Sequence, residues 1–84
     1  MSQSQKKTYG KVADAMLYFS RIIYENLEFH IPFTRQELAD LIGISRESAT
    51  RVLLKLKEDG ILSVEDRVVK MKDLDLLQQI SRNG

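Results

Sequence analysis

A short stretch near the middle of the chain carries Arg46, Glu47, Thr50 and Arg51, whose side chains form directional hydrogen bonds. Arginine presents a planar fork of donors that matches O6 and N7 of guanine, and glutamate accepts from the N4 amine of cytosine. A glutamate that faces DNA is otherwise costly, because it meets phosphates of its own sign. The residue types therefore indicate contacts with base edges, with an ordinary solvated helix surface as the alternative.

The spacing of these residues places them on one face of a predicted helix over about residues 46–59. With Arg46 at zero and about 100° per residue, Thr50 falls near 40°, Glu47 near 100° and Arg51 near 140°. Glu47 and Arg51 also have the favourable order for an i,i+4 ion pair. The apolar residues of the same stretch fall between about 240° and 340°; they are Ala49, Val52, Leu53 and Leu56.

The preceding residues predict a second helix and a tight connection. Thr34 with Glu37 three residues later forms a capping-box pattern, in which each side chain satisfies a backbone N–H of the other residue. Gly43 suits the left-handed turn that follows a helix, and Ser45 is a good N-cap for the next one. Two helices joined through a short glycine turn are typical of a helix-turn-helix.

The flanking segments complete a fold that is mainly α with a small β-wing. Residues 8–26 have the apolar spacing of one long helix, and residues 29–33 around Pro32 read as a short extended piece, with an edge strand as one alternative. Residues 61–64 and 68–71 predict a hairpin with a short charged tip. Asp73 can cap a final short helix whose apolar side carries Leu74, Leu77 and Ile80. This order of elements predicts a winged helix-turn-helix.

One residue does not fit the polar face of the second helix. Leu54 falls near 80° on the same count, among the charged positions. Because this leucine lies further along the helix than the charged residues, we expect it under the wing or under the first helix rather than at DNA, and the sequence does not decide between the two.

Composition bounds the remaining function classes. The chain has 84 residues, 43% of them hydrophobic and 30% charged, with a net charge of only +1. Because it has no cysteine, a disulfide framework and a thiolate metal site are excluded. No apolar run approaches the roughly 20 residues that a membrane span needs. We therefore expect no membrane contact and a cytoplasmic location.

The stretch "FTRQELADLIGISRESATRVLLKLKEDGIL" resembles the DNA-binding domain of the Crp/Fnr family of bacterial transcription regulators, and "DLLQQIS" resembles that family's tail. The resemblance implies base contacts from Arg46, Glu47 and Arg51. It also implies phosphate contacts from Thr34, Gln36, Ser45 and Ser48, and from Arg67 in the wing.

The resemblance also implies partners and a larger parent protein. Family members carry an effector-sensing barrel and a dimerisation helix before this domain, and we expect residues 1–84 to be the single DNA-binding domain without them. The expected partner is double-stranded DNA, as a pseudo-palindromic operator bound by a homodimer of the parent. RNA polymerase is a further candidate partner of that parent.

Two other function classes remain as alternatives. A winged helix can serve as a protein-interaction module without specific DNA binding, which predicts an exposed apolar patch around Tyr18, Tyr24 and Leu54. An enzyme is not expected, because Ser45 and Ser48 have neither a glycine elbow nor a predictable histidine partner. His30 is the only histidine, so no metal site and no cofactor are expected.

Overall fold

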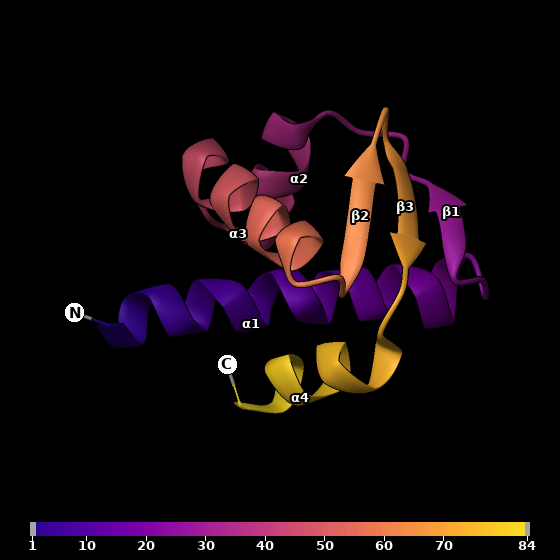
Figure 1. Cartoon of the computed structure of the whole chain (residues 1–84). Helices are drawn as coiled ribbons and strands as arrows, with labels where there is room; N and C mark the ends of the chain where they lie inside the picture. The colour runs from indigo at the N-terminus through magenta and orange to yellow at the C-terminus, as the bar shows by residue number, and fades with distance from the viewer. Residues whose placement is uncertain (1, 84) are drawn as a thin grey trace.

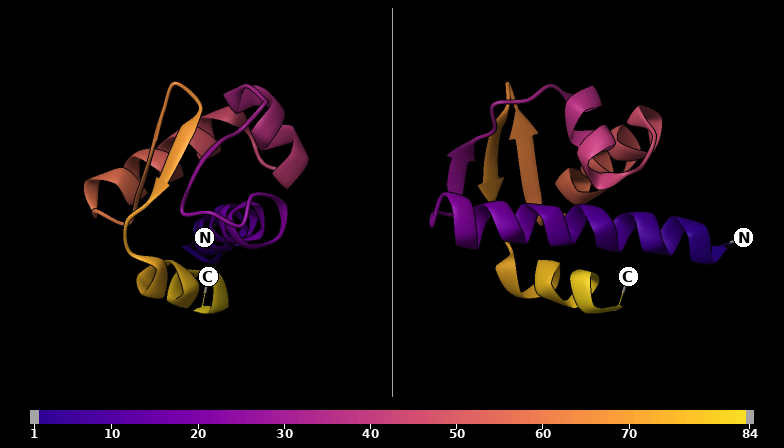
Figure 2. Two further views of the ribbon diagram at one scale, coloured as in Figure 1. Left: turned by 90° about the vertical axis from the view of Figure 1, so that its right-hand side faces the viewer. Right: turned by 180° about the vertical axis from the view of Figure 1, so that it is seen from behind.

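The computed structural model describes residues 2–83, with side chains described for residues 8–82. The elements follow the order α1 (Ser2–Tyr18), η1 (Phe19–Ile23), β1 (Glu28–His30), α2 (Arg35–Ile42), α3 (Arg46–Glu58), β2 (Leu62–Glu65), β3 (Val68–Met71) and α4 (Leu74–Asn83). The long helix α1 is the central layer. The sheet and the pair α2–α3 lie on one side of it, and α4 lies on the other (Figures 1 and 2). This is a winged helix-turn-helix, as predicted.

The first helix differs from its prediction at its C-terminal end. It ends at Ile23 rather than at Asn26, and its last part, η1, is a π-helical turn in which the Tyr24 N–H donates to the Phe19 carbonyl at 2.9 Å. Ser20 is buried, and its hydroxyl donates to the Asn26 carbonyl at 2.8 Å. Glu25 has a φ of +51°. These bonds turn the chain sharply back toward the sheet. The apolar spacing of the sequence continues beyond this turn, which is why it predicted too long a helix.

The sheet has one strand more than the predicted hairpin. Its order is β1-β3-β2, and both pairs are antiparallel, with Phe29 opposite Val69 and Val64 opposite Val69 on the other side. The extended segment before Pro32 therefore becomes an edge strand, as its reading allowed. It covers β3 on the side away from β2, so the wing is supported along its length.

The two helices of the helix-turn-helix begin and end as predicted. Thr34 caps α2 in a complete capping box: its N–H donates to Glu37 Oε1 at 2.8 Å, and the Glu37 N–H donates to Thr34 Oγ1 at 3.2 Å. Gly43 ends α2 in the left-handed region, at a φ of +88°. A side chain there would be strained, because only glycine adopts this region freely.

One core holds these elements together, and α1 supplies much of it. The largest fully buried side chains come from α1, α2, α3, the start of the sheet and α4; they are Met16, Leu38, Leu56, Ile61, Leu62, Leu77, Val12 and Val69. The Asp73 carboxylate accepts from the Leu76 N–H at 3.1 Å and caps α4 as predicted. The hydroxyl of Ser81 in α4 donates to the carboxylate of Asp14 in α1. The last helix is thus fixed on the far side of α1.

Candidate nucleic-acid interface

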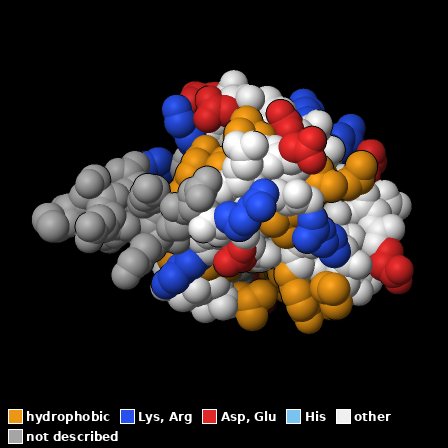
Figure 3. Space-filling view, turned by 90° about the horizontal axis from the view of Figure 1, so that it is seen from below, with side chains coloured by type: hydrophobic (Ala, Val, Ile, Leu, Met, Phe, Trp, Pro, Cys, Tyr) orange, Lys and Arg blue, Asp and Glu red, His pale blue; other side chains and the backbone are white. Residues whose placement is uncertain are grey.

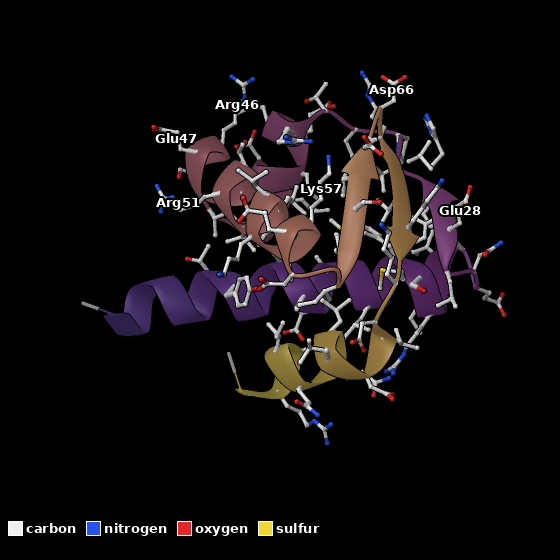
Figure 4. All side chains as sticks on the ribbon, viewed as in Figure 1. Glu28, Arg46, Glu47, Arg51, Lys57 and Asp66 are labelled. Carbon is white, nitrogen blue, oxygen red and sulfur yellow. The ribbon has the colours of Figure 1, made fainter. Side chains whose placement is uncertain are left out.

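Helix α3 has one buried face and one exposed face. Ala49 and Leu56 are fully buried, and Val52 and Leu53 are 6% and 4% exposed. The opposite face exposes the four predicted base-contact residues, which are Arg46, Glu47, Thr50 and Arg51. Figure 4 shows the labelled Arg46, Glu47 and Arg51 pointing away from the body of the molecule, from the first turns of α3. The buried face therefore fixes α3 in the fold, and the opposite face remains accessible.

The start of α3 is fixed by its own serines. The Ser48 N–H donates to Ser45 Oγ at 3.1 Å, which satisfies one of the unpaired donors of the first turn. The two hydroxyl oxygens lie 2.9 Å apart and are hydrogen-bonded. Ser45 is exposed and Ser48 is half-buried. The structure brings these two predicted phosphate contacts together at the helix start.

The predicted phosphate contacts of α2 lie at its first turn. Thr34 is the cap, and both Thr34 and Gln36 are exposed. The Gln36 side-chain amide donates to Asp40 Oδ1 at 3.0 Å. One of its two N–H donors is thus engaged within the helix, and this bond restricts the rotamers of the side chain.

The predicted ion pair between Glu47 and Arg51 does not form. Among the side chains that the structure describes, the ion pairs are Lys55–Asp59 at 3.9 Å and Lys57–Glu65 at 3.7 Å. Glu47 and Arg51 are both exposed, and an exposed pair of this spacing gains only about 0.3–0.5 kcal/mol against the entropy of ordering two long side chains. The prediction was wrong, since water competes well at this position.

The wing ends in a two-residue turn with an unusual backbone. Asp66 and Arg67 have φ values of +55° and +66°, and they connect Glu65 and Val68, which are paired across the hairpin. Two positive φ angles match the twist of a tight hairpin, although Asn-Gly is the preferred sequence. The Arg67 carbonyl accepts from the Ile31 N–H at 2.9 Å. The wing tip, with Arg67 exposed, is thereby held against the chain that leads into α2.

The exposed face of α3 and the tip of the wing lie on the same side of the molecule. In Figure 4, Asp66 at the tip of the hairpin and Arg46 on α3 both stand on the side opposite α1 and α4. Lys57 lies between α3 and β2 in this view, and its ammonium pairs with Glu65 of β2. This link was not predicted, although Lys57 falls near 20° on the helical count, on the polar face.

The structure decides the burial of three apolar residues, Leu54, Tyr18 and Tyr24. Leu54 is 55% exposed, so neither the wing nor the first helix covers it. Tyr18 is also exposed, at 54%, but Tyr24 stacks on Phe29 with ring centroids 5.0 Å apart. Tyr24 therefore belongs to the edge of the core. Ile22, Ile23 and Leu27, which follow Tyr18 in the sequence, are also exposed.

The face over α1 and α4 carries side chains of several kinds. Over α1 and α4, the space-filling view has acidic, basic and apolar side chains interspersed (Figure 3). His30 is exposed at the end of β1. Among the side chains described, no group of three or more His, Cys, Asp or Glu residues is arranged to hold a metal ion. Within the described part of the chain, every helix is too short or too polar to cross a membrane.

Comparison with known proteins identifies relatives of this fold and sequence. Residues 10–80 match the model of the Crp-like helix-turn-helix domain. The chain is 37% identical over 41 residues to the transcriptional activator protein FnrL of Cereibacter sphaeroides, and 56% identical over 36 residues to the CRP-like protein Clp of Xanthomonas campestris. These segments cover 49% and 43% of this chain, and 16% of each relative.

Solved structures give the same result for the fold. The catabolite activator protein of Thermus thermophilus superposes with a TM-score of 0.81 at 32% identity, over 95% of this chain and 36% of that one. FixK2 of Bradyrhizobium japonicum superposes with a TM-score of 0.80 at 23% identity, over 87% of this chain and 37% of that one. The chain thus spans about a sixth of the curated relatives and about a third of these solved chains.

Proposed function

The chain belongs to the Crp-like helix-turn-helix domain family, whose members are transcription regulators and not enzymes, and from this premise we propose that it reads duplex DNA in a sequence-specific manner. In this proposal α3 enters the major groove, while the wing and the starts of α2 and α3 contact the backbone. The larger relatives place such a domain within a longer regulator. The DNA-binding class follows from the family, and the specificity is our proposal.

The observation that carries the proposal is the polarity of α3. A helix about 10–12 Å wide fits the major groove, which is about 12 Å across. Its buried side packs Ala49 and Leu56 into the core, so the exposed side is presented with little freedom. Base readout gains from a helix backbone that is already fixed, because ordering a segment on binding costs free energy.

The four exposed residues of this face have distinct proposed roles. Arg46 and Arg51 donate to guanine O6 and N7, and Glu47 accepts from a cytosine N4 amine. Because Glu47 and Arg51 are not paired with one another, each retains its full hydrogen-bonding capacity for DNA. Thr50, one turn after Arg46, offers both a hydroxyl and a methyl group to the bases between them.

Backbone contacts fix the register of this face on DNA. We assign the phosphate contacts to the residues that the family resemblance implies, which are Thr34, Gln36, Ser45, Ser48 and Arg67. Hydroxyls and amides at the start of helices suit phosphate oxygens, because the N-terminal N–H groups and the helix dipole favour an anion there. Arg67 would reach the backbone on the other side of the groove, where the wing tip is supported by Ile31.

The parent state we propose is a two-fold dimer on a pseudo-palindrome. A dimer of helix-turn-helix domains reads half-sites about 34 Å apart on one face of the duplex. A single domain engages one half-site and lacks the gain in effective concentration that linkage provides. The isolated chain is therefore expected to bind more weakly than a dimeric regulator.

A binding-site selection tests the proposed readout. The wild-type chain is used to enrich duplexes from a randomised library, and the Arg51→Ala variant is used in parallel. We expect wild type to enrich a G·C pair whose preference the variant loses, with an affinity cost of about 1–3 kcal/mol on the wild-type site. Unchanged base preferences with Arg51→Ala would rule out this assignment.

A protein-interaction module is the second candidate function, and one observation favours it. Tyr18, Ile22, Ile23 and Leu27 expose 51–61% of their surface at the end of α1 and in the following segment. If this surface, rather than α3, were the functional one, duplex binding would be weak and equal for all sequences. The selection above would then enrich nothing with wild type.

A further inference from the structure

Leu54 is an exposed leucine on the face that we propose for DNA. It is 55% exposed, and on the helical count it falls near 80°, between Thr50 near 40° and Arg51 near 140°. An exposed leucine alone needs no explanation, since much of any protein surface is apolar. The informative feature is its position, because this residue extends the row formed by Thr50 and the charged readers.

The neighbours of Leu54 argue against a protein-binding patch at this place. Its neighbours on α3 are Lys55, Lys57 and Glu58, all of them exposed and charged. Apolar surfaces that dock proteins are contiguous and cover several hundred Å². Leu54 is instead a single apolar side chain on an otherwise polar helix face.

The major groove offers one apolar group of matching size. Thymine is the only base of DNA that presents a methyl group there, and aliphatic side chains contact it. With a rise of 1.5 Å per residue, Leu54 lies about 6 Å beyond Thr50 along the helix axis, and about 4.5 Å beyond Arg51. With α3 lying along the groove in the proposed complex, these spacings correspond to one or two base pairs at about 3.4 Å per step.

We infer that Leu54 is a specificity-determining residue that contacts the C5-methyl group of a thymine beside the base pair read by Arg51. This inference rests on the proposed function. It predicts a thymine in the half-site, which the contacts of the charged residues alone do not predict. Leucine has no hydrogen-bonding group, so the preference comes from burial of one methyl group against another apolar surface.

Replacement of thymine by uracil tests the contact, because the exchange removes the methyl group and keeps the base pairing. The probe is the duplex that wild type selects, with each thymine of a half-site replaced in turn. We expect one replacement to weaken wild-type binding about three- to fivefold, the loss that corresponds to one methyl group. Leu54→Ala should bind both duplexes equally, at the affinity of wild type for the uracil duplex.

Two further variants separate this contact from general effects. Leu54→Met keeps an apolar side chain and should keep the sensitivity to uracil. Leu41→Ala removes another exposed leucine, 64% exposed in α2, and should leave the sensitivity unchanged. Because Leu54 is exposed and alanine favours helices, Leu54→Ala is expected to fold like wild type, which its circular dichroism would verify.

The outcomes distinguish the inference from the proposed function. If wild type selects no duplex over scrambled DNA, the proposed function fails. If wild type selects a duplex but every uracil replacement affects wild type and Leu54→Ala equally, the function stands and the inference is overturned. A selected half-site without any thymine would overturn it as well.

Discussion

Some residues on the proposed interface are held by backbone bonds that leave their side chains available. Arg67 is the clearest case, because its carbonyl accepts from Ile31 while its side chain remains exposed. Its φ of +66° lies in a region that residues other than glycine avoid, and such a conformation costs about 1–3 kcal/mol. The wing tip therefore retains an arginine at a position where glycine would fit the backbone better.

Arg67→Gly separates the backbone strain from the charge. The variant is expected to have a free energy of unfolding equal to that of wild type or up to about 1 kcal/mol higher, because glycine adopts a positive φ without strain. Its affinity for all duplexes should fall alike, and the slope of log affinity against log salt should decrease by about one. Thermal unfolding and titrations at several salt concentrations measure both quantities.

Arg67→Lys is the matched control for the charge. It keeps a cation at the wing tip, so the salt slope should remain close to that of wild type. A loss of base preference at a single position in Arg67→Gly, with the salt slope unchanged, would contradict a phosphate contact.

Among the elements, α2 and α3 each carry a small residue at a fully buried position. Ala39 and Ala49 are both fully buried, and Gly43 turns the chain between the two helices at a φ of +88°. The orientation of the exposed arginines depends on this packing, because α3 is held through its buried face. A larger residue at the crossing should therefore affect stability and recognition together.

Ala39→Leu tests this support. Overpacking of a well-filled core costs about 1–3 kcal/mol, and we expect such a loss in the free energy of unfolding by chemical denaturation. Specific DNA affinity should fall further than non-specific affinity, because α3 is displaced relative to the wing. Leu41→Ala on the exposed face of the same helix should change stability by no more than about 0.5 kcal/mol. Equal effects of the two substitutions would contradict the packing account.

The elements also show which features can be predicted from sequence. Thr34, Gly43, Ser45 and Asp73 gave correct helix ends, because caps and left-handed turns depend on a few neighbouring residues. The π-helical turn at Phe19–Ile23 was missed, because its Tyr24–Phe19 backbone bond and the bond from the Ser20 hydroxyl to the Asn26 carbonyl have no signature in the apolar spacing. The pairing of β1 with β3 joins segments far apart in sequence, which local patterns do not reveal.

The candidate site was predictable to a similar extent. Helical periodicity alone separated the exposed Arg46, Glu47 and Arg51 from the buried Leu56, and the structure agrees with that division. The pairing of charges was not predictable, because an exposed ion pair is close to neutral in free energy. Lys57 pairs with Glu65 of the wing, a tertiary contact with no signal in the spacing of α3.

For the whole molecule, the weak net charge has a consequence for binding. With 13 basic and 12 acidic residues, the chain lacks the strong positive field that attracts DNA without regard to sequence. Non-specific affinity should therefore be low, and the face formed by α3, the helix starts and the wing must supply most of the binding. The near-neutral charge therefore favours sequence-specific binding over non-specific binding to nucleic acid.

The most direct test of the central claim is a fluorescence titration of the chain with a duplex that it selects, compared with a scrambled duplex of the same composition, at two salt concentrations. We predict that both affinities fall as salt rises, because phosphate contacts release counterions. The preference for the selected duplex should persist at the higher salt, because base contacts carry it. Equal affinity for the two duplexes at both salt concentrations, or no salt-dependent binding to either, would contradict the account.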